Sequence, residues 1–321
     1  MKSIDISKSA HLIGHHHPVY ALAMAADGKG FYSGGNDKGV VQWSLEPPGF
    51  VKVLCPVPTS VYSLHALPDG MGLLLSMRSG EVWWVSTDQG QVVRRFALHK
   101  EPVFAIGTRM GAGGQLELVV GSEDGWVSVW NLEQESEVAE QATDRGPIYH
   151  FKLSDVGIRC MALSPDGKWL CFGTKDGKIS VLNSLDYSRH KVWDAHAQGT
   201  TSLCFSPDGK YLLSSGRDAR FCVFRTSDFG LEKEFVPHMY AVYAIQYHPT
   251  LPVFATASRD KSVKIWSAED FRLLRSISMD KGLDAHRFSV NALSWDHSGR
   301  YLLTTGDDKV VMIWGIEMQR E

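Results

Sequence analysis

The chain contains no long apolar run and no sustained helical periodicity. No apolar stretch approaches the roughly 18 residues that span a bilayer as a helix. The first residues, MKSIDISKSAHLIGHHH, include no apolar segment typical of a secretory signal. No segment repeats its apolar positions every three to four residues, the spacing of an amphipathic helix. We therefore expect few or no helices, no membrane association and a cytoplasmic location.

Cysteine is sparse and unpatterned. The chain has five cysteines in 321 residues, and none forms a CxxC pair. An odd number without regular spacing favours neither a disulfide framework nor a zinc site. Four of the five lie inside apolar runs, which indicates small buried thiols in a reducing compartment. The five are Cys55, Cys160, Cys171, Cys204 and Cys222.

Neither an excess of charge nor a known catalytic motif is present. The formal net charge is −3, which gives no bulk attraction to nucleic acid or to anionic membranes. The chain contains no GxSxG, Walker or HExxH motif. His15, His16 and His17 are adjacent, so their side chains point in different directions, and no cysteine or acid has ligand spacing to them. We therefore predict no metal, no cofactor and no catalytic residue.

What the chain does have is an internal repeat. The phrase SPDGKYLLSSGRD from Ser206 recurs as SPDGKWLCFGTKD from Ser164, and more loosely from Ala25, His248 and Asp296. Each repeated unit has an Asp six residues before an apolar or Trp position. These pairs are Asp37 and Trp43, Asp124 and Trp130, Asp176 and Leu182, Asp218 and Phe224, Asp260 and Trp266, and Asp308 and Trp314. A seventh, degenerate unit has Arg78 and Trp84 in these positions.

Each unit also contains short runs that are typical of strands. In the fifth unit four such runs, rich in β-branched and aromatic residues, cover 201–205, 210–215, 220–225 and 231–236. Pro-Asp-Gly turns between the first two runs favour a tight reversal. A period of roughly 40–45 residues with four short strands per unit is the signature of a propeller blade. The predicted fold class is all-β, a seven-bladed β-propeller of four-stranded antiparallel blades.

These repeats resemble the WD-repeat (WD-40) family across essentially the whole chain. Gly14-His15, Ala195-His196, Pro237-His238 and Ala285-His286 match the start of the family pattern, and His99 matches it in the third unit. The resemblance implies a hydrogen-bonded tetrad of His, Ser or Thr, Asp and Trp in each complete blade. The implied sets are His15, Ser33, Asp37 and Trp43; His238, Thr256, Asp260 and Trp266; and His286, Thr304, Asp308 and Trp314.

The other four units depart from this pattern. The fifth has His196, Ser214 and Asp218, with Phe224 in place of Trp. The third has Val120 at the hydroxyl position, the fourth keeps only its Asp, and the second keeps only Trp84. We therefore expect the second and fourth blades to depend more on apolar packing against their neighbours.

The whole chain is expected to form one propeller domain, residues 1–321. The N-terminal stretch, residues 1–13, is expected to complete the last blade as its outer strand and so to close the ring, because an open ring would expose two sheet edges. The expected units are roughly 14–54, 55–97, 98–142, 143–194, 195–236, 237–283 and 284–321.

Two rings of side chains are candidates for a binding surface on one face, called the top. The residue before each Asp position gives Asn36, Met77, Glu123, Lys175, Arg217, Arg259 and Asp307. Lys175, Arg217 and Arg259 form a basic arc, because Arg binds carboxylate or phosphate bidentately. The alternative is ordinary solvated charge. The second ring, five residues after each Gly-His position, is Tyr20, Tyr62, Phe104, Arg159, Thr201, Tyr243 and Asn291.

The aromatic members of the second ring, Tyr20, Tyr62, Phe104 and Tyr243, are expected either to anchor a partner or to pack within the channel wall. Two long connections are also expected at the top face, since long loops on a rigid scaffold often carry recognition. One runs over residues 134–156 and includes Tyr149, His150 and Phe151, which alternatively cover the fourth blade. The other, SMDKGLDAHRF, ends in Arg287 and Phe288.

The leading functional hypothesis is a non-catalytic scaffold, monomeric on its own, that binds another protein or an acidic or phosphorylated peptide. It rests on the family resemblance and the top-face residues, since fold alone does not define function. One alternative is an enzyme with a small-molecule site at the channel mouth. A second is RNA or single-strand binding through the aromatic ring and the basic arc, against which the acidic Glu123 and Asp307 argue.

Overall fold

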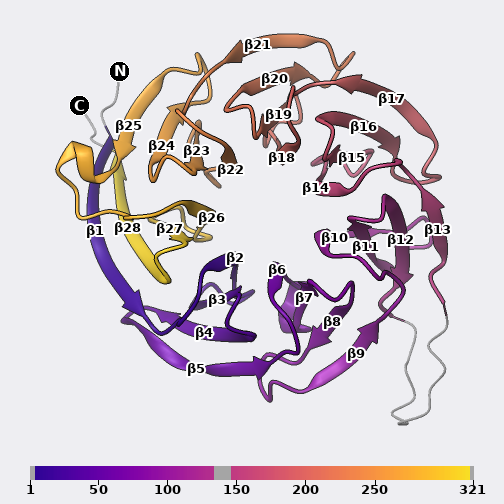
Figure 1. The fold of residues 1–321 in the computed structure, drawn as a ribbon, viewed down its shortest axis with the longest axis horizontal. Coiled ribbons are helices and arrows are strands. Elements are labelled where there is room, and N and C mark those ends of the chain that lie inside the picture. Colours follow the sequence, from indigo (N-terminus) through magenta and orange to yellow (C-terminus); the bar gives the residue numbers. More distant parts are fainter. Residues whose placement is uncertain (1–3, 134–145, 319–321) are drawn as a thin grey trace.

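A ring of seven sheets makes up the molecule. The computed structural model describes residues 4–133 and 146–318, and these form seven four-stranded antiparallel sheets around a central axis (Figure 1). Blades are numbered here by the chain order of their innermost strands. The innermost strands contact those of both neighbouring blades. The predicted all-β, seven-bladed propeller is confirmed.

The first three blades, each from its innermost to its outermost strand, are built as follows. Blade one is β2 (Val19–Met24), β3 (Gly30–Gly35), β4 (Gly39–Leu45) and β5 (Pro48–Pro56). Blade two is β6 (Val61–Ala66), β7 (Leu73–Met77), β8 (Val82–Val85) and β9 (Val92–Phe96). Blade three is β10 (Val103–Met110), β11 (Leu116–Ser122), β12 (Trp126–Asn131) and β13 (Tyr149–Lys152).

The other four blades repeat this order. Blade four is β14 (Ile158–Leu163), β15 (Trp169–Thr174), β16 (Lys178–Asn183) and β17 (Arg189–Asp194). Blade five is β18 (Thr200–Phe205), β19 (Tyr211–Gly216), β20 (Phe221–Arg225) and β21 (Leu231–Phe235). Blade six is β22 (Val242–Tyr247), β23 (Val253–Ser258), β24 (Val263–Ser267) and β25 (Leu273–Ile277). Blade seven is β26 (Val290–Trp295), β27 (Tyr301–Gly306), β28 (Val310–Met318) and β1 (Ile4–Ile13).

Helical structure in the described part of the chain is limited to two short 3₁₀ turns, η1 (Pro68–Gly70) and η2 (Met279–Lys281). Within the same residues, no helix is long and apolar enough to cross a membrane.

The core lies between blades rather than within one blade. Phe221 of blade five stacks on Phe254 of blade six, with ring centroids 5.3 Å apart, and Trp266 joins the same buried cluster. The second strand of every blade is almost wholly buried, whereas β17 and β21 on the rim alternate or expose charged side chains. Each blade therefore buries its apolar faces against its two neighbours.

The N-terminal strand closes the ring, as predicted. β1 pairs antiparallel with β28, from Ile4 opposite Met318 to Ile13 opposite Val310 (Figure 1). The Ile4 side chain is only 1% exposed and lies in one apolar cluster with Trp314. Lys8 forms an ion pair with Asp284 of the connection before blade seven.

The alignment predicted for the degenerate second unit is wrong by one residue. Val61 pairs with Met77 as Val19 pairs with Gly35, which makes Arg78 equivalent to Asn36. The Asp position is therefore occupied by Ser79 and the Trp position by Val85. A slip of one residue turns a strand side chain to the opposite face. Trp84 accordingly lies half-buried and donates its Nε1–H to the Met71 carbonyl.

The prediction that the 134–156 connection enters the top face is wrong for residues 149–152. Tyr149, His150 and Phe151 lie in β13, which pairs with β12 as the outer strand of blade three. The boundary expected at residues 142 and 143 thus assigns this strand to the wrong unit. β-Branched and aromatic residues in a short run are as compatible with a rim strand as with a loop. Residues 134–145 lie outside the described part of the chain.

In blades one, six and seven the structure brings together the four residues of each implied tetrad. In blade six, Trp266 Nε1–H donates to Thr256 Oγ1 (2.9 Å), which lies 2.8 Å from His238 Nε2. His238 Nδ1 lies 2.9 Å from an Asp260 carboxylate oxygen. The corresponding contacts in the other two blades measure 2.6–2.9 Å. A buried chain of this kind stabilises a fold when every member is satisfied.

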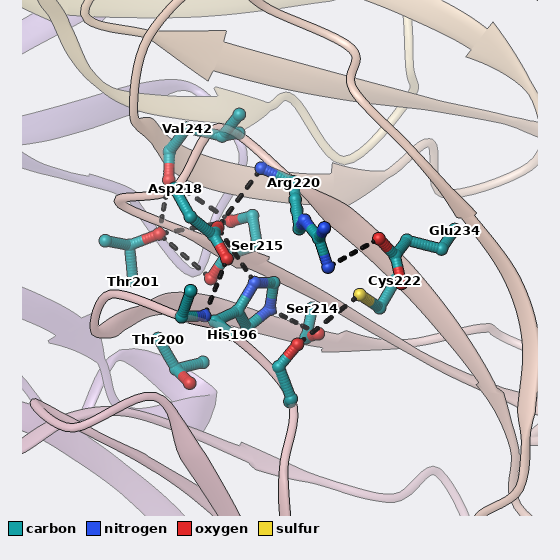
Figure 2. Close-up of polar contacts among 12 residues, drawn as sticks. His196, Thr200, Thr201, Ser214, Ser215, Asp218, Arg220, Cys222, Glu234 and Val242 are labelled. Carbon is teal, nitrogen blue, oxygen red and sulfur yellow. Dashed lines mark hydrogen bonds and ion pairs between the residues drawn. The ribbon is translucent and has the colours of Figure 1, made fainter.

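Two incomplete units build related networks. In blade three the hydroxyl comes from Ser128, which pairs across the sheet with Val120 and contacts both His99 Nε2 (2.9 Å) and Trp130 Nε1 (3.0 Å). In blade five, His196 contacts Ser214 and Asp218 at 2.8 and 3.1 Å (Figure 2). The presence of Phe224 leaves that network without an indole donor.

The tetrad carboxylates also hold the top-face loops. In blade six, an Asp260 oxygen accepts from the backbone N–H of Met239, the residue after the tetrad histidine, at 3.1 Å. Asp37, Asp218 and Asp308 accept equivalent bonds at 2.8–3.3 Å. The tetrad thus fixes the loop that precedes the innermost strand.

The Asp260 and His238 pair links the stability of blade six to pH. Burial raises the pKa of Asp260, but hydrogen bonds from His238, Ser262 and the Met239 amide outweigh burial and hold this pKa far below its ordinary value. Burial lowers the pKa of His238, and Asp260 opposes that change. Both groups bind protons more readily in the unfolded chain. The stabilising contribution of each group is therefore present above its unfolded pKa, about 6.5 for His238 and about 3.9 for Asp260. It is lost as the pH falls below that value.

Deletion of residues 1–12 is expected to lower the melting temperature by about 5 °C or more, because blade seven loses its outer strand and the burial of Ile4. Circular dichroism during thermal unfolding measures this. The double variant Ser9→Ala/His11→Ala, which changes two exposed side chains of β1, serves as the control and should melt like the wild type. A deletion variant with an unchanged melting temperature would contradict closure by β1.

Replacement of Asp260 by Asn is expected to lower the free energy of unfolding at pH 7 by about 1–3 kcal/mol. The difference from wild type should shrink as the pH falls from about 5 to 3, because only the wild type loses the Asp260 contribution there. Thermal unfolding across this pH range measures it, with the exposed Glu269→Gln of the same blade as control. A difference that does not change with pH would contradict the assigned linkage.

Candidate functional site

The innermost strand of every blade carries a β-bulge at the same place. In β2 the register shifts between Val19 and Ala21, so Tyr20 is the extra residue, and each other blade repeats the shift. Such a bulge redirects a side chain that the regular pleat would send elsewhere. The seven bulge residues are Tyr20, Tyr62, Phe104, Arg159, Thr201, Tyr243 and Asn291, the ring predicted from sequence.

All seven bulge residues line one cavity of about 550 Å³ at the mouth of the central channel. Lys175, Arg217 and Asp307 also line it. Two members of the predicted basic arc therefore share a cavity with the aromatic ring. Arg259, Arg287 and Phe288 are not among its lining residues.

A repeated backbone hydrogen bond fixes the position of the first predicted ring, the residues before each Asp position, which we call the outer ring. In blade four the N–H of Lys175 donates to the carbonyl of Gly157, the residue before the innermost strand. The same bond occurs in all seven described blades, from Asn36, Arg78, Glu123, Arg217, Arg259 and Asp307 as well. The prediction that Met77 belongs to this ring is therefore wrong. Met77 is fully buried, and Arg78 takes its place.

An unbroken ladder of flat side chains covers the cavity wall over blades one to four. The rings of Tyr20 and Tyr62 lie 5.7 Å apart, and those of Tyr62 and Phe104 stack at 4.6 Å. The guanidinium of Arg159 lies over Phe104 at 4.5 Å. Each of these side chains comes from a different blade. The ladder therefore forms only when the bulges of neighbouring blades lie side by side.

The end of the ladder is strongly cationic. One oxygen of Glu123 accepts from Arg159 (2.7 Å) and from Lys175 (3.0 Å). The other oxygen is buried without a hydrogen-bond partner among the described residues. A Cβ at Gly157 would lie 2.4 Å from this second oxygen, so a larger residue there would require the carboxylate to move. Burial lowers the pKa of Arg159 and Glu123 opposes the change, so Arg159 stays charged.

Arg217 adds a third positive charge beside this pair. Its side chain is exposed and, within the described residues, forms no ion pair. Three cations of blades four and five therefore line the cavity, and Glu123 pairs with two of them, Arg159 and Lys175. The mouth has a local excess of positive charge here, although the chain as a whole is slightly acidic.

The opposite side of the mouth is polar and acidic. Asn291 donates to an Asp307 carboxylate oxygen at 2.8 Å and to the Val19 carbonyl at 3.0 Å. Burial raises the pKa of Tyr20, and the negative charge of Asp307 raises it further. The cavity is therefore electrostatically polarised, positive at blades four and five and negative at blade seven.

Exposed apolar side chains surround the mouth at blades six and seven. Met239 and Tyr240 are 80% and 56% exposed, and Phe288 is 57% exposed. Arg259 lies over the Tyr240 ring at 6.0 Å. The backbones of Met239 and Arg287 are held by tetrad carboxylates, so this surface is presented on fixed loops.

The sequence prediction leaves Arg159 out of the basic arc, although Arg159 lies beside Lys175 in the cavity. It also assigns Arg78 to the Asp position, whereas Arg78 belongs to the ring of residues before that position and does not line the cavity. The signal for Arg159 is its place among aromatic residues in the same repeat position. Within the described residues, no group of three or more His, Cys, Asp or Glu side chains is placed to hold a metal ion. Both ring nitrogens of His15 contact tetrad partners.

Comparison with known proteins supports the repeat assignment. The family model described as "WD domain, G-beta repeat" matches residues 7–44, 146–183, 187–225, 230–267 and 278–315. The first four matches each run from the outer strand of one blade through the three inner strands of the next. Sequence repeats therefore overlap neighbouring blades, which ties the ring together.

Two curated relatives share parts of the chain. Apoptotic protease-activating factor 1 of Rattus norvegicus is 28% identical over 54% of this chain, and the match spans 13% of that relative. The ciliary WD repeat-containing protein ctxp80 of Euplotoides octocarinatus is 33% identical over 29% of this chain and 12% of its own length. The matched region is thus a small part of each relative. The family model, in contrast, matches more than half of this chain, and the chain therefore belongs to the WD domain, G-beta repeat family.

Proposed function

We propose that this protein is a non-catalytic scaffold that binds a partner polypeptide across its top face, with partner side chains entering the channel mouth. The observation that carries the proposal is the cavity that combines an aromatic wall with three cations. Aromatic and Arg side chains on a rigid surface are typical anchors of protein interfaces. The excess of positive charge favours an acidic or phosphorylated peptide.

The apolar side chains near the mouth extend this surface. Met239, Tyr240 and Phe288 would contact apolar residues of the partner, while Arg259 and Arg287 would meet acidic residues beside them. Held loops lower the entropy cost of binding, because less of the surface must be ordered in the complex.

The two alternative functions receive less support from the site. Single-stranded nucleic acids stack successive bases on a series of aromatic side chains. In the ladder, Phe104 already contacts Tyr62 and Arg159, and Tyr243 is a single ring apart from the ladder. A hydrolytic enzyme would need a base near a nucleophile. The described residues that line the cavity include no histidine, and their one carboxylate, Asp307, accepts from Asn291.

A cytoplasmic location is part of the proposal. All five cysteines are free thiols, and burial raises the pKa of Cys55 and Cys204 to about 11. Buried thiols with raised pKa values are unreactive and compatible with a reducing compartment.

The top-face variant Lys175→Glu/Arg217→Glu/Arg259→Glu is expected to capture at least about tenfold less partner protein from native lysate than the wild type does. The reason is that three cations are replaced by negative charges that repel an acidic partner. Quantitative mass spectrometry of the captured proteins measures this. The matched control Lys29→Glu/Lys168→Glu/Lys210→Glu reverses three exposed charges in turns between the first and second strands, on the opposite face. Equal capture by both variants would contradict binding at the top face.

A further inference from the structure

Two of the seven bulge residues have short side chains, one in blade five and one in blade seven. Blades one, two, three and six carry Tyr or Phe at this position, and blade four carries Arg159. Blade seven carries Asn291, whose amide is bound to Asp307 and to the Val19 carbonyl, and blade five carries Thr201. Because the bulges are equivalent, the short side chain leaves a gap between Arg159 of blade four and Tyr243 of blade six. We call this gap the blade-five notch, formed by Arg159, Lys175, Thr201, Arg217 and Tyr243, all of which line the cavity.

The Thr201 hydroxyl is engaged by the scaffold. It donates to the Val242 carbonyl and lies 3.0 Å from the Ser215 carbonyl (Figure 2). The Ser215 hydroxyl also donates to the Val242 carbonyl, at 3.2 Å. The polar group of Thr201 is therefore satisfied within its own blades, and the notch is defined by missing volume rather than by a free hydroxyl.

The wall of the notch at blade four is a guanidinium that is already oriented. Phe104 covers one face of Arg159 at 4.5 Å, and Glu123 holds its Nη2 at 2.7 Å. In ring order the notch follows Arg159 on the side away from Phe104. A planar guanidinium stacks on aromatic rings through its faces. An aromatic ring placed in the notch would continue the ladder from Arg159 toward Tyr243.

The charges around the notch favour an anion. Lys175 shares the Glu123 carboxylate with Arg159, and Arg217 forms no ion pair among the described residues. One protein carboxylate thus pairs with two of the three cations of the notch. A phosphate or carboxylate beside Lys175 and Arg217 would offset the remaining charge through charge-assisted hydrogen bonds.

We propose that the blade-five notch binds one side chain of the partner that combines an aromatic ring with a negative group, as phosphotyrosine does. The ring stacks between Arg159 and Tyr243, and the phosphate contacts Lys175 and Arg217. An aspartate or glutamate side chain would supply the charge but not the ring, and inorganic phosphate would supply no apolar surface. This inference rests on the proposed function, because it names the chemistry of the group that the mouth receives.

Isothermal titration of the full chain with phenyl phosphate and with inorganic phosphate tests the notch directly. Phenyl phosphate is expected to bind about tenfold more tightly, through stacking on Arg159 and Tyr243. Equal dissociation constants for the two probes, or binding of neither, would overturn the proposal. A tripeptide with a central phosphotyrosine should bind at least as tightly as phenyl phosphate. Weaker binding of the tripeptide would indicate that the notch binds a free small anion. It would overturn the proposal that the notch binds a side chain of the partner.

A variant that fills the notch tests the contribution of its shape to binding independently of its charge. Thr201→Phe keeps every cation and places an aromatic ring where four other blades already carry one, so the backbone accommodates it. This variant should bind phenyl phosphate at least about tenfold more weakly, because its own ring occupies the notch. Thr201→Ser, the matched control, should bind like the wild type. Unchanged binding by Thr201→Phe, with a melting temperature equal to that of wild type, would overturn the notch.

Charge variants complete the test and keep the two proposals distinguishable. Arg217→Gln should weaken both probes, and Lys210→Gln, an exposed residue of the opposite face, should leave both unchanged. Equal effects of the two variants would overturn the notch as the anion site. If the wild type captures a partner that the top-face variant loses, yet binds no phenyl phosphate, the scaffold stands and the notch fails. If phenyl phosphate binds but no captured partner depends on the top face, the scaffold fails.

Discussion

Burial of apolar surface between neighbouring blades is the interaction on which the rest of this structure depends. A single four-stranded blade has no core of its own, because clusters such as Phe221 with Phe254 join side chains from two blades. The ring must therefore close, and β1 closes it by pairing with β28. The overlap between matched repeats and blades reinforces this closure. A closed ring also holds seven innermost strands at fixed positions around one channel.

The recognition chemistry follows from this arrangement. Each innermost strand presents its bulge residue into the channel mouth, and the repeated backbone bond sets a second residue above it. The backbone of each position is equivalent, so the chemistry depends on the side chain placed there. Aromatic residues in blades one to three, cations in blades four and five and the acidic Asp307 in blade seven give the mouth apolar, positive and negative parts. The scaffold is repeated, whereas its binding surface is not.

Sequence reasoning succeeded where a blade contains its full pattern of turn and tetrad residues. In blades one, six and seven the spacing of His, Ser or Thr, Asp and Trp defined the strand register. Blade two has neither His nor Asp, so its alignment relied on Trp84, and the slip misplaced Met77 and Arg78. The hydroxyl of blade three comes from Ser128, across the sheet from the expected position. The stacking of Arg159 depends on contact between neighbouring blades, which spacing within one repeat does not reveal.

The central claim is that the channel mouth is where a partner binds. Hydrogen–deuterium exchange of the chain, with and without a captured partner, tests it most directly. We expect slower exchange in the bulge segments around Arg159, Thr201 and Tyr243 and in the top-face loops of blades six and seven. Protection confined to the rim strand β5 or to the turns at Lys168 and Lys210, with the bulge segments unchanged, would contradict binding at the channel mouth.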